Sequence, residues 1–268
     1  MPIGTESDET NCQVALPGSP RSINHERCTR TERSPVRLRL ALTTSALAAV
    51  LLTAACSSSE STAEAVDISG VADGTSATFV AEVWADNWFS LTVNGELIGE
   101  DSVPITTERS FNAETFTFEA TYPLTIAVEA KDFKETDSGL EYIGENNQQM
   151  GDGGLILQIT DQDTGAIVAT TSEEWRALVI HEAPLNKDCE DSSDPDNDCE
   201  SRIVDAPSGW TDVDFDDSAW TNATAWSSSD VGPKDGYDEI SWSSSAQLIW
   251  GTDLESDNTV LVRFAVGS

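Results

Sequence analysis

Alternating apolar and polar residues run through the middle of the chain and predict β-strands. Along the segment 88–93 every second side chain is apolar, namely Phe89, Leu91 and Val93, as a strand with one buried face requires. Asn94-Gly95 follows, and both residues tolerate the positive φ angles of a two-residue hairpin turn. The sequence therefore predicts that 88–93 pairs with a second strand over 96–100.

Further short segments carry the same signal of alternation or of β-branched residues. They are 77–84, 111–121, 124–130, 155–160, 167–171, 174–181, 246–250 and 258–266. A long polar loop is expected over 139–154, and no amphipathic helical stripe of ten or more residues is present. Short strands separated by Gly, Asn and Asp turns indicate an all-β sandwich.

The N-terminal part of the chain has the pattern of a leader. Arg37 and Arg39 precede the apolar run 40–55, which ends in small residues immediately before Cys56. A basic region, a short apolar region and small residues at the cut describe a signal peptide, and Leu-Thr-Ala-Ala-Cys resembles the lipobox of bacterial lipoproteins. Cys56 is therefore the predicted lipid attachment site. The alternatives are an ordinary secretory signal and an uncleaved membrane anchor.

Residues 1–35 do not suit a signal peptide, because five acidic residues and two cysteines precede its basic region. We interpret this segment as a misassigned start, with translation beginning at Val36. The expected organisation is a leader over 1–55, with the signal peptide at 36–55, a flexible tether over 56–74 and one folded domain over 75–268.

Removal of the leader leaves two cysteines besides Cys56, at positions 189 and 199. In an exported chain this pair predicts a disulfide, which would close an acidic loop over 188–200. We expect the protein in the bacterial cell envelope, attached to the bilayer at the exported face of the membrane by acyl chains on Cys56.

The charge of the chain restricts its partners. The 268 residues carry a formal charge of −34, and the segment 56–268 retains 8 basic and 43 acidic residues, a formal charge of −35. Such a field repels nucleic acid and bare anionic membrane surfaces. The eight tryptophans and the β-branched segments argue against disorder, which is the other explanation of high charge.

Several motifs together suggest a family. The segments DNWFSLTVNG (86–95), FDDSAW (215–220), Ile249-Trp250 and 258–264 resemble the galactose-binding-domain-like jelly rolls, which are accessory β-sandwiches beside the catalytic modules of rhamnosidases and family 2 glycoside hydrolases. The resemblance covers about 75–268 and implies a jelly-roll β-sandwich. VNG precedes FDDSAW here, whereas the family has the reverse order. The chain therefore looks circularly permuted, or strands from a neighbouring module have been appended.

The acidic loop is a candidate calcium site. Asp194, Asp196 and Asp198 alternate with Pro195 and Asn197, and calcium takes six to eight oxygen ligands from closely spaced carboxylates and carbonyls. The spacing imitates the start of an EF-hand loop, but the Gly and the later Glu of that loop are absent. The other interpretation is a solvated acidic loop.

A carbohydrate site is the second candidate, because sugar-binding sandwiches combine exposed aromatic rings with amides. The expected ligand-binding residues are two aromatic residues beside polar loops and four consecutive amides: Tyr142, Trp226, Asn146, Asn147, Gln148 and Gln149. Most of the other tryptophans are expected in the core.

No motif for catalysis is present: Gly-x-Ser-x-Gly, HExxH and phosphate-binding loops are absent. The sequence predicts a surface-anchored, non-catalytic binding module for extracellular carbohydrate, with calcium as a candidate cofactor. The alternatives are a structural or protein-interaction sandwich without a sugar site, and a divergent glycoside hydrolase.

Overall fold

The structure is a computed structural model that describes residues 74–106 and 111–267, all within the compact unit Ser59–Ser268. The predicted leader, Cys56 and residues 57–73 of the tether lie outside the described residues, so the predictions for them are untested. Among the described residues no helix has the length and hydropathy needed to cross a bilayer.

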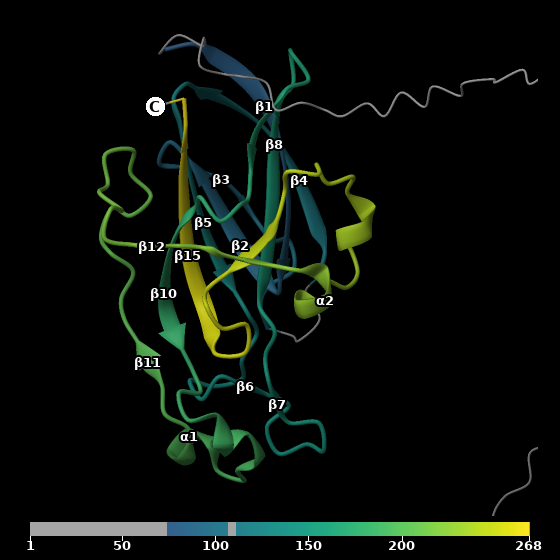
Figure 1. The fold of residues 1–268 in the computed structure, drawn as a ribbon, viewed down its shortest axis with the longest axis vertical. Coiled ribbons are helices and arrows are strands. Elements are labelled where there is room, and N and C mark those ends of the chain that lie inside the picture. The colour runs from purple at the N-terminus through teal and green to yellow at the C-terminus, as the bar shows by residue number, and fades with distance from the viewer. Residues whose placement is uncertain (1–73, 107–110, 268) are drawn as a thin grey trace, which may run out of the picture. The chain divides into compact units, whose positions relative to one another are not determined.

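The described residues form an all-β fold built from antiparallel sheets, as the strand pattern predicts. The first sheet contains, in spatial order, β13 (Thr224–Trp226), β14 (Leu248–Trp250), β8 (Gly154–Asp161), β1 (Ser76–Asp86) and β4 (Ala113–Thr121), and β9 (Ile167–Thr170) also pairs with β8. The second contains β11 (Arg202–Ile203), β10 (Arg176–Glu182), β15 (Asp257–Val266), β5 (Leu124–Lys131), β2 (Trp88–Val93) and β3 (Glu96–Glu100), and β12 (Thr221–Asn222) also pairs with β10. Figure 1 shows the long strands of both sheets.

The predicted hairpin is confirmed. Asn94 and Gly95 have φ angles of 51° and 80°, and β2 pairs with β3 on either side of them. Phe89, Leu91 and Val93 are buried, so the alternation along β2 places its apolar face in the core.

The core lies between the two sheets. One cluster joins apolar side chains of β1 and β8 with those of β2, β5 and β15, and Phe79, Leu157 and Val128 are completely buried within it. Trp175 is buried beside them and stacks on Phe264, with ring centroids 5.3 Å apart. The packing of the β1 and β8 side chains against those of β2, β5 and β15 joins the two sheets face to face, which makes the fold a sandwich.

The FDDSAW segment forms a tight turn. The Ser218 N–H donates to the Asp216 carboxylate at 3.0 Å, and Trp220 is buried. Phe215 is half-buried, packs edge-on against Trp220 and lies beneath the Arg263 guanidinium. The turn thus attaches the 210–220 segment to β15.

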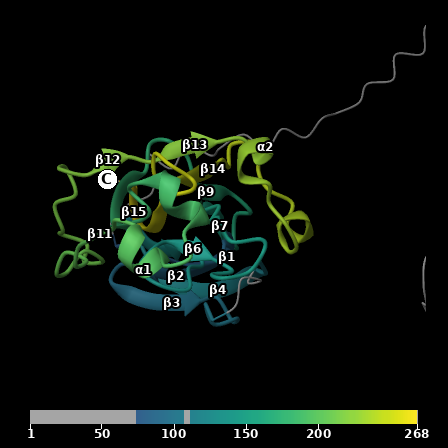
Figure 2. The same cartoon turned by 90° about the horizontal axis from the view of Figure 1, so that it is seen from below.

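The loop over 139–154 is more ordered than its polar composition suggests. It contains the two-stranded sheet of β6 (Leu140–Glu141) and β7 (Gln149–Met150), and both residues of β6 are buried. Figure 1 shows this small sheet with helix α1 (Pro195–Asp198) at the lower end of the long strands, and Figure 2 views the same end.

The disulfide Cys189–Cys199 is confirmed, with a Cα–Cα distance of 5.4 Å. It closes the segment 189–199, which contains the end of the 3₁₀ turn Lys187–Asp191 and all of helix α1. The described residues also include the 3₁₀ turn Tyr237–Glu239 and helix α2 (Ser228–Val231). Both α-helices are four residues long, in agreement with the absence of a helical stripe in the sequence.

Candidate functional site

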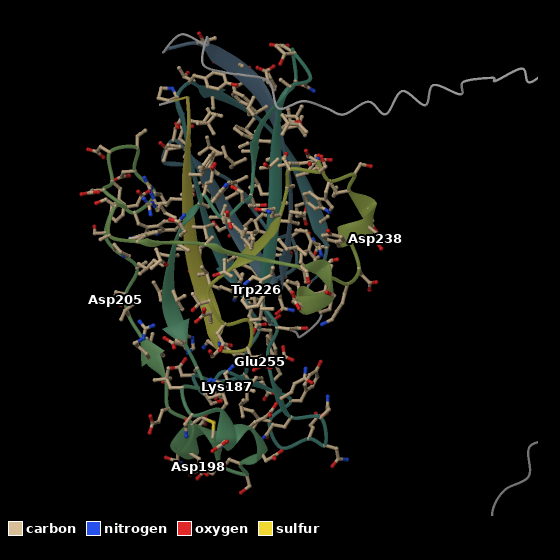
Figure 3. All side chains as sticks on the ribbon, in the orientation of Figure 1. Lys187, Asp198, Asp205, Trp226, Asp238 and Glu255 are labelled. Carbon is tan, nitrogen blue, oxygen red and sulfur yellow. A yellow bond between two sulfur atoms is a disulfide. The ribbon has the colours of Figure 1, made fainter. Side chains whose placement is uncertain are left out.

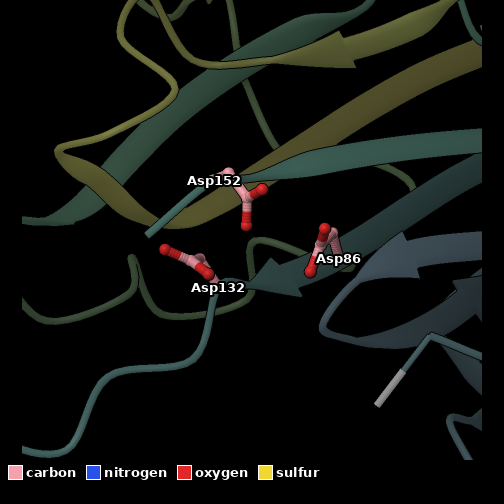
Figure 4. Close-up of side chains that lie close together, drawn as sticks. All are labelled: Asp86, Asp132 and Asp152. Carbon is pink, nitrogen blue, oxygen red and sulfur yellow. The ribbon is translucent and has the colours of Figure 1, made fainter. Parts of the chain in front are cut away.

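Three aspartates from three strand ends meet at one place. Asp86 is the last residue of β1, Asp132 directly follows β5, and Asp152 precedes β8 by two residues. One carboxylate oxygen from each residue lies within 4.8 Å of the others, and Figure 4 shows the three side chains converging. We call this group the Asp86–Asp132–Asp152 cluster.

Backbone contacts explain why the strand ends meet. Asp86 is in register with Gly154 of β8, which places the end of β1 beside Asp152. Asn87 then joins β1 to β5, because its N–H donates to the Lys131 carbonyl at 2.7 Å and its Oδ1 accepts from the Phe133 N–H at 2.5 Å. Residues of two different sheets are thereby held together at the cluster.

Two of the three carboxylates are shut off from solvent. Asp86 is 0% exposed and Asp132 is 2% exposed, and none of their four carboxylate oxygens has a hydrogen-bond partner. Gly151 permits the close approach to Asp132, because a Cβ at position 151 would lie 1.8 Å from Asp132 Oδ2. Buried polar groups are nearly always paired, so these oxygens call for an explanation.

Burial and mutual repulsion make the charged form of the cluster costly. Burial, followed by the negative charge of Asp152, raises the pKa of Asp86 to about 8. Burial, followed by the charges of Asp86 and Glu141, raises the pKa of Asp132 well above its usual value. The Lys234 ammonium opposes this repulsion in part, since its Nζ lies 3.3 Å from Asp152 Oδ2 and 3.9 Å from Asp86 Oδ2.

A pocket of about 630 Å³ lies beside the cluster. Asp152 belongs to both the cluster and the pocket wall, and Lys234 also lines the pocket. Its other walls combine two aromatic residues with amides and carboxylates, among them Phe111, Tyr142, Asn112, Gln149, Asp235 and Glu239. The pocket therefore offers ring surfaces and hydrogen-bonding groups together, which is typical of small-molecule sites.

The structure divides the predicted carbohydrate residues into separate groups. Tyr142 and Gln149 line the pocket. Gln148 instead donates to the carbonyl oxygens of Glu190 and Ser192, at 2.6 and 2.8 Å, and so ties β7 to the disulfide loop. Asn146 and Asn147 are exposed on the same loop and do not line the pocket.

Trp226 lies in a neighbouring hollow of about 710 Å³, which Gln149 and Asp152 also line. Its indole Nε1 donates to the Gly251 carbonyl at 3.1 Å, and the ring is half-buried. Figure 3 shows Trp226 well separated from Asp198 of the acidic loop. Two of the six predicted residues therefore line the pocket, and Trp226 lines the adjacent hollow.

The predicted calcium ligands do not converge. The Asp194 carboxylate accepts from the Asn197 amide at 2.9 and 3.0 Å, and the Asp198 carboxylate accepts from the Ser192 hydroxyl. Within 74–106 and 111–267, the Asp86–Asp132–Asp152 cluster is the one group of three or more His, Cys, Asp or Glu side chains whose ligand atoms lie close enough together to hold a metal ion. Calcium binding by Asp194, Asp196 and Asp198 stays a prediction without support from this geometry.

The Asp86–Asp132–Asp152 cluster was not predicted from the sequence. Its residues stand at the ends of predicted strands, with Asp86 after 77–84, Asp132 after 124–130 and Asp152 before 155–160. That position is the signal that could have found them. Comparison of the chain with protein-family models, curated proteins and solved structures finds no match.

Proposed function

We propose that this protein is a non-catalytic binding module for extracellular carbohydrate, with a galactose-binding-domain-like jelly roll as its fold. In this proposal the domain is held at the exported face of a bacterial membrane by lipid on Cys56. The antiparallel sandwich and the FDDSAW turn are compatible with that fold, and the confirmed disulfide is compatible with export.

The observation that carries the proposal is the composition of the 630 Å³ pocket. Phe111 and Tyr142 provide aromatic surface for the apolar face of a sugar ring, while Asn112, Gln149 and Asp235 provide partners for its hydroxyls. Pockets of 300–1,000 Å³ are the usual size for small ligands. A neutral glycan carries no charge that the acidic field of the chain would repel.

The burial of Asp86 and Asp132 favours glycan binding over glycan hydrolysis at this cluster. A general acid must come within hydrogen-bond distance of the proton acceptor in the substrate. The carboxylate oxygens of Asp86 and Asp132 are shielded from solvent, so a sugar in the pocket does not reach them. Asp86 and Asp132 therefore give no support to a glycoside hydrolase, which would have to use the carboxylates of the pocket wall, such as Asp152, Asp235 and Glu239.

The proposal is tested by isothermal titration of the full chain with a panel of soluble neutral and acidic polysaccharides. We expect saturable binding to one glycan class, and loss of affinity on the order of tenfold or more in Tyr142→Ala if the ring is a central contact. Asn147→Ala is the matched control, since Asn147 lies on the same loop outside the pocket. Its affinity should equal that of the wild type.

Three outcomes contradict the proposal in different ways. Release of reducing sugar from the bound glycan would identify a hydrolase. Binding lost in Trp226→Phe but kept in Tyr142→Ala would move the site to the neighbouring hollow. Absence of binding to the whole panel would favour a structural or protein-interaction role.

A further inference from the structure

We propose that Asp86, Asp132 and Asp152 bind one calcium ion at the end of the sandwich, beside the 630 Å³ pocket. This inference is independent of carbohydrate binding, since it concerns the affinity of the protein for the cation alone. It assigns the metal to a different place from the acidic loop over 188–200.

The spacing of the three carboxylates suits a single ion. Calcium binds oxygen ligands at 2.3–2.6 Å, so two ligands on opposite sides of one ion lie roughly 5 Å apart at most. The ligand oxygens of Asp86, Asp132 and Asp152 lie within 4.8 Å of one another. All three side chains therefore reach one ion placed between them (Figure 4).

The unpartnered oxygens point to a ligand. Both oxygens of Asp86 and both of Asp132 are buried without a hydrogen bond, and an unpaired ionised carboxylate is very costly to bury. A divalent cation would satisfy these oxygens and reverse the repulsion among the three carboxylates. Gly151 allows this arrangement, because a Cβ at position 151 would collide with Asp132 Oδ2 and displace that carboxylate from the cluster.

Lys234 does not fulfil the same role. Its Nζ lies 3.9 Å from Asp86 Oδ2, which is too far for a hydrogen bond, and its single positive charge faces three carboxylates. Its side chain is 46% exposed, so the ammonium is free to move toward solvent when an ion enters. Lys234 therefore competes with the cation for the cluster.

The donors select calcium among the common cations. The cluster offers oxygen ligands alone, without His or Cys, and hard cations prefer such donors. Three carboxylates can supply up to six oxygens, which matches the six to eight that calcium takes, whereas magnesium keeps several waters and demands a strict octahedron. The Asp152 side chain is 40% exposed and lines the pocket. A calcium ion can therefore reach the cluster from the pocket on the Asp152 side, where water can complete its coordination.

The experiment measures calcium binding by the chelator-treated full chain, without glycan, by equilibrium dialysis and by thermal unfolding. We expect saturable binding of calcium and a rise in Tm of about 5–10 °C at a free concentration roughly 100 times the dissociation constant. Asp132→Asn and Asp152→Asn should each abolish the calcium-dependent rise. Asp152 is partly exposed, so its variant folds even if a change at Asp132 disturbs the core.

Two control variants separate the site from its alternatives. Asp196→Asn, in the acidic loop, should leave the calcium response unchanged. Lys234→Met should strengthen calcium binding, because it removes a positive charge next to the ligands. Carbohydrate binding can fail while all these results hold, so the two proposals are tested separately.

The proposal is overturned if the wild type shows no calcium-dependent rise in Tm. It is also overturned if Asp196→Asn abolishes the response while Asp152→Asn keeps it, since the acidic loop would then be the site. A loss of stability in Lys234→Met with no gain in calcium affinity would identify Lys234 as the structural counter-ion of the cluster instead.

Discussion

Arg263 holds the 210–217 segment against the sandwich, and its removal gives a sharp test of the fold. Arg263 lies in β15 and is 3% exposed. Its Nε donates to Asp217 Oδ2 at 2.9 Å, and its Nη groups donate to the carbonyl oxygens of Trp210 and Asp212. The guanidinium also lies over the Phe215 ring, 5.2 Å from its centroid.

The replacement Arg263→Met keeps most of the apolar length of the side chain and removes these donors. Breaking a buried ion pair by removing one partner costs about 3–5 kcal/mol. Asp217 is 29% exposed and can recover hydration, so we expect the lower end, about 3 kcal/mol. For a domain of this size each kcal/mol lowers Tm by about 2–4 °C, which gives a decrease of about 6–12 °C.

The measurement is the free energy of unfolding of the full chain in urea. Arg176→Met is the matched control, because Arg176 is opposite Arg263 in the β10–β15 pairing and makes its 2.8 Å side-chain hydrogen bond with the exposed Asn222. Its cost should stay below about 1 kcal/mol, as for other surface polar contacts. A double-mutant cycle with Asp217→Asn should give a coupling of about 0.5–3 kcal/mol.

Equal destabilisation by Arg263→Met and Arg176→Met would contradict a role of the Arg263 guanidinium in holding this segment. Absence of coupling in the cycle with Asp217→Asn would contradict it as well. In either case the 210–217 segment is held by its aromatic contacts, such as that between Phe215 and Trp220, and not by the guanidinium.

Two further predictions concern the disulfide and His181. Replacing both Cys189 and Cys199 by Ser should lower the free energy of unfolding by roughly 3 kcal/mol, the loop-closure entropy expected for their separation of 10 residues; equal urea midpoints for variant and wild type would contradict this. Burial, followed by the charge of Lys134, lowers the pKa of His181. The unfolded chain therefore gains a proton near pH 6.5 that the folded protein still lacks, so stability is fully present above that pH and decreases as the pH falls below it. Urea unfolding between pH 7.5 and 5.5 should show this decrease in the wild type relative to His181→Gln, and parallel curves would show that His181 is not responsible.

The strands could be predicted because their signals are local. The period-two pattern over 88–93 and the turn residues Asn94-Gly95 depend on neighbours within a few positions, and β2 and β3 have the predicted bounds. The strand predicted over 258–266, a segment rich in β-branched residues, likewise matches β15 to within one residue. The polar composition of 139–154, in contrast, conceals β6 and β7, because a two-residue strand is too short for any period.

The candidate site was only partly predictable. Tyr142 was chosen for its place beside a polar loop and does line the pocket, whereas Gln148 was chosen on the same ground and is committed to the carbonyl oxygens of Glu190 and Ser192. Composition shows that an amide is present but not which neighbour receives its hydrogen bonds. That choice depends on how the loop folds against the disulfide segment.

The all-β class, the hairpin and the cysteine pair could be predicted from the chain alone. Alternation and turn residues are properties of short segments, and the even number of remaining cysteines is a matter of composition. The meeting of Asp86, Asp132 and Asp152, in contrast, depends on tertiary folding. Among the 43 acidic residues of the segment 56–268, nothing local distinguishes these three. They come together because β1 and β8 pair in one sheet while Asn87 joins the end of β1 to β5 in the other, and their burial follows from the packing of the two sheets.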